Sequence, residues 1–70
     1  MIAARLIHDA NQIALYFAAY PHDEAVAGIA DHIRKFWDPR MRADLRAMLD
    51  GEEAGLHALV RDAGGKLRAG

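Results

Sequence analysis

The chain has 70 residues, and its formal net charge of −1 gives it no general attraction to the phosphates of nucleic acids or to anionic lipids. Nucleic acid and membranes are therefore not expected partners. A chain of this length forms one domain, and folding buries only about 60% of the surface that its unfolded form exposes. Because such a core is small, we expect a protein partner to supply additional stability.

The sequence contains no Cys, Ser or Thr. This composition excludes the hydroxyl and thiol nucleophiles of covalent acyl transfer, and it excludes disulfides, Cys-ligated zinc and thiolate-bound iron–sulfur clusters. The histidines fall on separate segments and lack the i,i+4 spacing of a helical zinc pair. They are His8, His22, His32 and His57. We therefore expect no catalytic residue, no metal site and no cofactor in this chain.

The sequence also lacks the usual membrane and export signals. No apolar stretch reaches the ~20 residues that a membrane-spanning helix needs. The first residues, Met-Ile-Ala-Ala-Arg, do not form a basic leader followed by a continuous hydrophobic region. We therefore expect the protein to act in the cytoplasm.

Hydrophobic periodicity predicts an amphipathic first helix over residues 3–19. Apolar side chains recur there at intervals of three and four residues, at Ala3, Leu6, Ala10, Ile13, Ala14 and Phe17. Pro21 then disfavours helical backbone at Tyr20, and Asp23 can accept the free amides that begin the next helix. A second helix is thus predicted over residues 23–37.

An Asp-Pro step separates the second helix from the third. Asp38 suits the N-cap position, and Pro39 suits the first helical position, where no amide partner is required. The third helix is predicted over residues 39–50. Gly51 is expected to close it in the left-handed conformation that commonly follows a helix.

A fourth, shorter helix is predicted over residues 52–63. Its buried stripe consists of the apolar side chains Leu56, Leu59, Val60 and Ala63. Gly64 and Gly65 are expected to end this helix and to release a frayed tail over residues 64–70. The four segments together predict an all-α fold, a bundle of three main helices and a short fourth one.

The segment around the Asp-Pro step is the strongest candidate for a binding surface. Residues 30–42 combine Phe36, the only Trp and a cluster of basic side chains, and Trp and Arg are the residues most often found as interface anchors. We expect Asn11 and His32 to add polar contacts. The predicted partner interface is Asn11, His32, Phe36, Trp37, Arg40 and Arg42. Whether Trp37 docks a partner or fills the bundle is left open.

The first helix offers a second apolar side outside its main stripe. Its members are Ile7, Asn11, Leu15 and Ala18. A chain of this size cannot cover such a side and an aromatic corner at once, which is typical of a subunit interface. Self-association of the isolated chain is a further expectation.

The basic side chains support a second interpretation, a small helical DNA-binding or regulatory module. The cluster consists of Arg34, Lys35, Arg40, Arg42 and Arg46. Several of these cations have a carboxylate four residues away, in the pairs Asp31 with Lys35, Asp38 with Arg42, and Arg40 with Asp44. Because such pairing would neutralise much of the positive charge, the sequence favours a protein interface over a nucleic-acid interface.

Three motifs resemble one known family. They are residues 10–14 (Ala-Asn-Gln-Ile-Ala), residues 30–33 (Ala-Asp-His-Ile) and residues 36–42 (Phe-Trp-Asp-Pro-Arg-Met-Arg). The chain resembles the delta subunit of soluble NAD-dependent formate dehydrogenase over about residues 6–63. The Phe-Trp-Asp-Pro-Arg-Met-Arg run is the specific part of this resemblance.

The resemblance implies a noncatalytic accessory subunit in a cytoplasmic bacterial complex. The large subunits of that complex are implied to carry a molybdenum or tungsten pterin centre, iron–sulfur clusters and FMN, and to oxidise formate while reducing NAD. The small subunit is implied to support assembly, stability or activity through contacts with those large subunits. Which large subunit it contacts is left open.

Overall fold

Four helices account for most of the chain in the computed structural model, which describes the backbone of residues 2–51 and 55–69 and the side chains of residues 4–51 and 55–67. The helices are α1 (Ile2–Phe17), α2 (His22–Phe36), α3 (Pro39–Asp50) and α4 (Ala58–Ala69). The predicted all-α fold is confirmed. None of the four helices is long and apolar enough to cross a membrane within the residues described.

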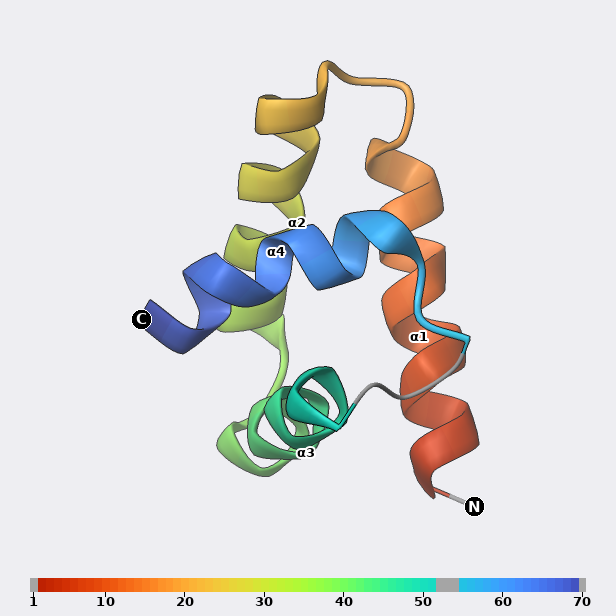
Figure 1. Ribbon diagram of the computed structural model, residues 1–70, viewed down its shortest axis with the longest axis vertical. Coiled ribbons are helices and arrows are strands. Elements are labelled where there is room, and N and C mark those ends of the chain that lie inside the picture. The colour runs from red at the N-terminus through yellow and green to blue at the C-terminus, as the bar shows by residue number, and fades with distance from the viewer. Residues whose placement is uncertain (1, 52–54, 70) are drawn as a thin grey trace.

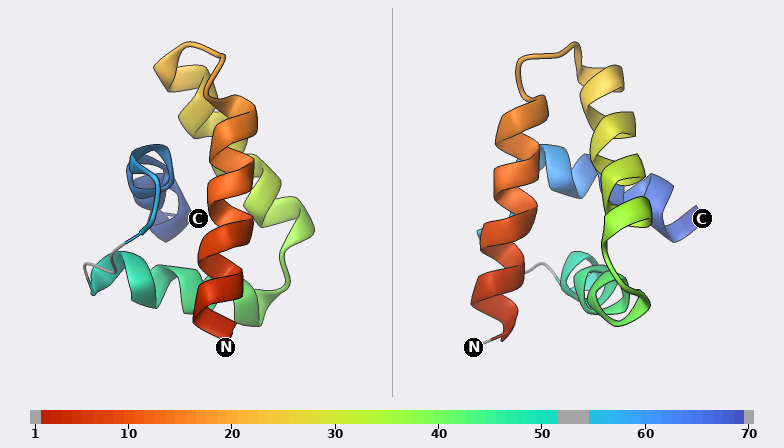
Figure 2. Two further views of the ribbon diagram at one scale, coloured as in Figure 1. Left: turned by 90° about the vertical axis from the view of Figure 1, so that its right-hand side faces the viewer. Right: turned by 180° about the vertical axis from the view of Figure 1, so that it is seen from behind.

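The first two helices form an antiparallel hairpin, and α4 crosses one side of it (Figure 1). The side views show α4 against that side only, whereas α3 begins on the opposite side, below α2, and runs toward the α4 side (Figure 2). The core lies where the elements meet. Its largest fully buried side chains are Ile29, Ile33, Leu45 and Val60, which come from α2, α3 and α4.

The helix boundaries near the two prolines follow local chemistry. α3 begins as predicted, because the Asp38 carboxylate accepts a hydrogen bond from the Met41 amide at 2.8 Å and Pro39 opens the helix. α2 begins at His22, one residue before the predicted start, with Pro21 at the N-cap. The expected capping role of Asp23 is not observed, since Asp23 already lies in the first turn of α2.

The ends of the first two helices also differ from the predicted bounds. α1 ends at Phe17 and not at residue 19, because the chain tightens into a turn in which the Tyr20 amide donates to the Phe17 carbonyl at 3.0 Å. α2 ends at Phe36, and Trp37 takes an extended conformation with φ −91° and ψ 141°. That conformation turns the chain toward Asp38 and the start of α3.

The prediction for the fourth helix is wrong in its bounds. α4 runs from Ala58 to Ala69, so Gly64 and Gly65 lie inside the helix and residues 64–69 are not a frayed tail. The physical reason is packing: Leu67 is 5% exposed, and burial of its side chain outweighs the low helix propensity of the two glycines. Residues 52–54 of the predicted helix lie outside the described part of the chain.

The left-handed glycine is Gly55 and not Gly51. Gly51 is the C-cap of α3, has φ −96° and donates its amide to the Ala47 and Met48 carbonyls, so the expected left-handed conformation is not found at Gly51. Gly55 has φ +97°, a conformation that glycine adopts without steric cost. It lies in the segment that leads into α4.

Candidate partner interface

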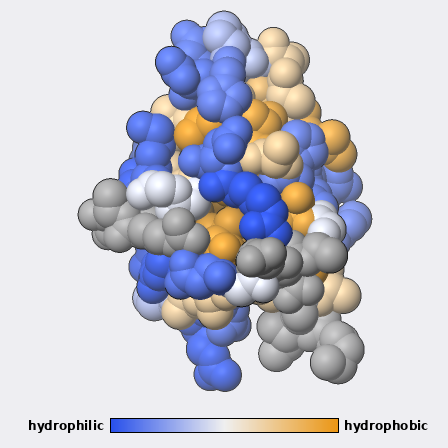
Figure 3. Space-filling view, viewed as in Figure 1, coloured by the Kyte–Doolittle hydropathy of each residue, from blue (hydrophilic) through white to orange (hydrophobic). Residues whose placement is uncertain are grey.

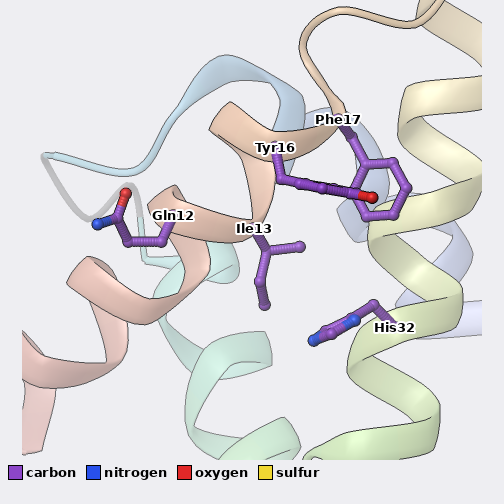
Figure 4. A pocket seen from close by; sticks show the side chains of 5 residues that line it. All are labelled: Gln12, Ile13, Tyr16, Phe17 and His32. Carbon is purple, nitrogen blue, oxygen red and sulfur yellow. The ribbon is translucent and has the colours of Figure 1, made fainter.

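An open groove lies between α1 and α2 on the side away from α4 (Figure 4). Its volume is about 410 Å³, and it is lined by Gln12, Ile13, Tyr16, Phe17 and His32. Ile13 and Tyr16 reach from α1 toward α2, and His32 reaches back from α2 (Figure 4). The groove therefore combines apolar walls with a few neutral polar groups, the composition typical of a binding pocket.

Exposed aromatic rings extend the groove along both helices. Tyr16 is 68% exposed and packs edge-on against Phe17 with ring centroids 5.0 Å apart. Phe36 is 72% exposed, and its ring lies 4.8 Å from the imidazole of His32. Tyr20 is 48% exposed and contacts Phe17 at 5.8 Å. We call these five residues the aromatic face.

The opposite side of the molecule differs in character. Figure 3 shows the face that carries α4, where hydrophilic side chains cover much of the surface and apolar ones show between them. Large exposed rings are rare on soluble monomers unless they take part in binding, since each leaves apolar area in water. The aromatic face is therefore the better candidate for a contact surface.

Gly28 sets the position of one wall of the groove. A Cβ atom at Gly28 would lie 2.5 Å from Cε1 of Phe17, well inside van der Waals contact. The absence of a side chain at this position lets the Phe17 ring pack directly on the backbone of α2. As a result, Phe17 packs on α2 and forms one wall of the groove.

Each of the two helices that form the groove carries an exposed ion pair between residues four apart. Arg5 lies 3.5 Å from the Asp9 carboxylate on α1, and Lys35 lies 3.1 Å from the Asp31 carboxylate on α2. The pair between Asp31 and Lys35 was predicted from the i,i+4 spacing and is confirmed. The groove lining itself contains no Asp, Glu, Lys or Arg.

Asn11 belongs to the scaffold and lies outside the groove lining. Its Nδ2 donates to the Gly55 carbonyl at 2.7 Å, and its Oδ1 accepts from the His57 amide at 2.8 Å. Both polar ends of the side chain therefore hold the segment that leads into α4. A sequence pattern could not show this, because the partners lie more than 40 residues away in the chain.

Trp37 fills the corner between α2 and α3. Its side chain is 8% exposed and belongs to the hydrophobic core. Of the two interpretations that the sequence left open, the structure shows the core-filling one in the isolated chain. Phe36, the neighbouring ring, points outward and is the exposed aromatic at this corner.

The arginines of the corner have different roles. Arg42 donates from Nη1 to the Arg34 carbonyl at 2.8 Å, near the C-terminal end of α2. Arg34 in turn donates to the Lys66 carbonyl and ties α2 to α4. Arg40 is exposed and makes no hydrogen bond or ion pair with the part of the chain that the structure describes. Arg40 is thus the cation of this corner that is available to a partner.

Of the predicted interface residues, the structure brings His32 and Phe36 together on one surface. Arg40 lies in the first turn of α3, and that turn is on the groove side of the molecule (Figure 2). The residues that the sequence did not single out are Tyr16, Phe17 and Tyr20. Their signal was present as bulky side chains at positions 13, 16 and 17 on one side of α1, followed by Tyr20 in the turn after it.

A hydrogen bond between His22 and Asp62 joins α2 to α4. The Nε2 atom of His22 lies 2.8 Å from Oδ2 of Asp62, which joins the first turn of α2 to α4. Hydrogen bonding to Asp62, assisted by Asp23, raises the pKa of His22 above its ordinary value of 6.5. The charged form of His22 is therefore stabilised by folding.

Comparison with known protein families identifies the chain. The sequence pattern of the NADH-dependent formate dehydrogenase delta subunit, FdsD, matches residues 5–63. The chain belongs to this family. Searches of curated proteins and of solved structures gave no match. The family resemblance seen in the three sequence motifs is therefore confirmed, and the chain is a delta subunit of formate dehydrogenase.

The described residues of this delta subunit offer few ligands for a metal or cofactor. They contain no group of three or more His, Asp or Glu side chains that could hold a metal ion. The chain also contains no Cys. The chain therefore has no thiolate with which to ligate an iron–sulfur cluster.

Proposed function

We propose that the chain is a noncatalytic accessory subunit of a cytoplasmic bacterial formate dehydrogenase, which supports assembly, stability or activity through contacts with the large subunits. The observation that carries this proposal is the aromatic face, because a chain of 70 residues leaves Tyr16 and Phe36 about 70% exposed on one surface. Membership of the family indicates that the partner enzyme is formate dehydrogenase. A surface of this kind binds protein by burying apolar area.

The chemistry of the reaction belongs to other subunits in this proposal. The molybdenum or tungsten pterin, the iron–sulfur clusters and FMN are carried by the large subunits, because this chain lacks thiolates and a cluster of metal-ligating side chains within its described residues. The role of the delta subunit is to bind and to stabilise a conformation of its partners. It neither binds formate nor transfers electrons.

The docking surface is proposed to consist of Phe36, His32 and Arg40 together with the groove. Phe36 offers an exposed ring, and Arg40 offers a guanidinium with no partner among the described residues; aromatic residues and Arg are enriched at protein interfaces. Asn11, Trp37 and Arg42 support this surface from within, since their polar atoms or rings already have intramolecular partners. They fix the geometry of the surface without reaching the partner.

The proposal is tested by removing and restoring the chain in cells that make the enzyme. In cells that lack this chain, we expect formate-dependent NAD reduction to fall, and expression of a tagged copy should restore it. The tagged copy should co-purify with the large subunits at a fixed stoichiometry. Purified chain alone should contain no stoichiometric metal or flavin and should not oxidise formate. A tagged copy that elutes without any large subunit would contradict the proposal.

A further inference from the structure

The groove has the dimensions of a receptor for one large side chain. On α1 its lining runs from Gln12 to Phe17, which corresponds to roughly 7.5 Å along the helix axis at 1.5 Å per residue. Side chains four residues apart on an adjacent helix are roughly 6 Å apart, so when one large side chain lies at the centre of the groove, the next lies beyond its edge. Antiparallel helices with an apolar groove between them are a common receptor for an amphipathic helix, whose anchors lie at intervals of three or four residues.

The charge distribution selects the chemistry of the occupant. The lining contains no carboxylate, Lys or Arg. A charged side chain placed in this groove would lose its hydration without gaining a counter-ion. An uncharged aromatic or branched aliphatic side chain buries its area there at no such cost.

Arg40 offers a partner a charged contact outside the groove lining. The first turn of α3, which contains Arg40, lies on the groove side of the molecule (Figure 2). Arg40 is exposed and forms no hydrogen bond or ion pair with the described residues. A partner helix that carries a carboxylate would supply its counter-ion. Because the chain belongs to a family of enzyme subunits, another subunit of that enzyme is the expected source of this helix.

We propose that the groove between α1 and α2 receives one aromatic or branched aliphatic side chain from a helix of a large formate dehydrogenase subunit, and that a carboxylate on the same helix pairs with Arg40. This inference rests on the proposed accessory role and names the chemistry of the contact. Gly28 is a positioning residue for it. By letting Phe17 pack on the α2 backbone, Gly28 keeps the groove open for the anchor.

The occupant can be identified by cross-linking in the assembled complex. The chain contains no Cys, so a Gln12→Cys variant carries a single thiol in the groove lining, to which a photoactivated cross-linker is attached. Leu15→Cys is the matched control, because Leu15 is 60% exposed on the same helix and does not line the groove. We expect the Gln12→Cys variant to cross-link to an apolar helical segment of a large subunit, and the Leu15→Cys variant to give at most a weak product.

Affinity measurements test the charge argument independently. Tyr16→Glu places a charge at the groove without disturbing the core and should weaken association with the large subunits by about tenfold or more. Leu15→Glu should change it by less than about twofold, as expected for a substitution outside the contact. Arg40→Glu should weaken association, while Arg46→Glu, at a second cation of α3, should have little effect. Circular dichroism verifies that each variant remains helical.

Three other results would contradict the inference or the proposed function. A cross-link from the Gln12→Cys variant only to a second copy of this chain would show that the groove is a self-association surface and would overturn the inference. Equal association by the Tyr16→Glu, Leu15→Glu and wild-type chains would overturn it as well, while the accessory role would still stand. If the wild-type chain fails to co-purify with the large subunits, the proposed function itself is wrong.

Discussion

The amide of Asn11 acts as a clamp between the first helix and the segment before the last one. One side chain donates to the Gly55 carbonyl and accepts from the His57 amide, and so it pairs two backbone groups of an irregular segment. Backbone groups in such segments need partners when helices do not supply them. A single amide at Asn11 therefore holds the segment that precedes α4 against α1.

We expect Asn11→Ala to lower the free energy of unfolding by about 1 to 2 kcal/mol, because two hydrogen bonds are lost and the half-buried His57 amide is left without a partner. Asn11→Asp should lose less, since it keeps an acceptor for that amide. Chemical denaturation followed by circular dichroism measures both. Gln12→Ala is the control, because Gln12 is the adjacent residue and its side chain is exposed. An equal loss of stability in this control would show that the hydrogen bonds of Asn11 do not stabilise the fold.

The contrast between Asp38 and Asn11 shows what a sequence can reveal at this scale. The N-cap at Asp38 was predictable because its partner, Met41, lies three residues away and the Asp-Pro step marks the position. The partners of Asn11 are set by the tertiary fold. For the same reason, the groove was not predictable: Tyr16 and His32 meet only after α1 and α2 have paired.

At the scale of elements, α4 shows how packing overrides local propensity. Two consecutive glycines normally end a helix, yet the apolar spacing of Val60, Ala63 and Leu67 continues across them, and all three side chains are buried. Gly64 is buried against Leu49, whereas Gly65 is exposed. The glycines therefore have different roles despite being neighbours. The periodicity was the better guide to the end of this helix.

We expect Gly65→Ala to stabilise the protein by about 0.5 to 1 kcal/mol, because no atom lies within 4 Å of the added Cβ and alanine loses less backbone entropy in a helix. Gly64→Ala should give no such gain, since its Cβ would lie 3.1 Å from Cδ1 of Leu49 and the leucine would have to shift. Thermal denaturation of the two variants checks this. Equal stabilisation by both would mean that Gly64 does not require close packing.

The contact between His22 and Asp62 makes the docking of α4 on α2 dependent on pH. Folding raises the pKa of His22, mainly through its hydrogen bond to Asp62. The contribution of this contact to stability is thus fully present below the ordinary pKa of 6.5, and it is lost as the pH rises through the raised value. The effect acts between elements and leaves each helix intact.

We therefore expect the stability difference between wild type and Asp62→Asn to be larger near pH 6 than near pH 9. Denaturant titrations at several pH values measure this difference. Asp44→Asn on α3 is the control, because it removes the same charge from a residue that forms no ion pair with the described residues. A difference that stays constant over this range would show that protonation of His22 does not contribute to the contact.

At the scale of the whole molecule, a small core and an exposed aromatic face belong together. The core includes five alanines on α1, α2 and α4 that contribute little apolar area, and it contains no buried polar or charged side chain within the described residues. The larger rings of Tyr16, Tyr20 and Phe36 remain in water instead. Much of the apolar area that would stabilise this fold is thus available only when a partner covers it.

We expect the isolated chain to unfold with a free energy of only a few kcal/mol and to gain stability on binding the large subunits, because a partner that binds only the folded state shifts the unfolding equilibrium. Hydrogen exchange measures the stability of the free chain and of the chain in the complex. Amides of Ile29 and Leu45, at the centre of the core, should exchange through global unfolding in the free chain and become more protected in the complex. A free chain with a concentration-independent melting transition above ~90 °C would show that the fold needs no partner. In that case the aromatic face would serve recognition alone, and Tyr16→Glu would weaken association without changing the protection of the core.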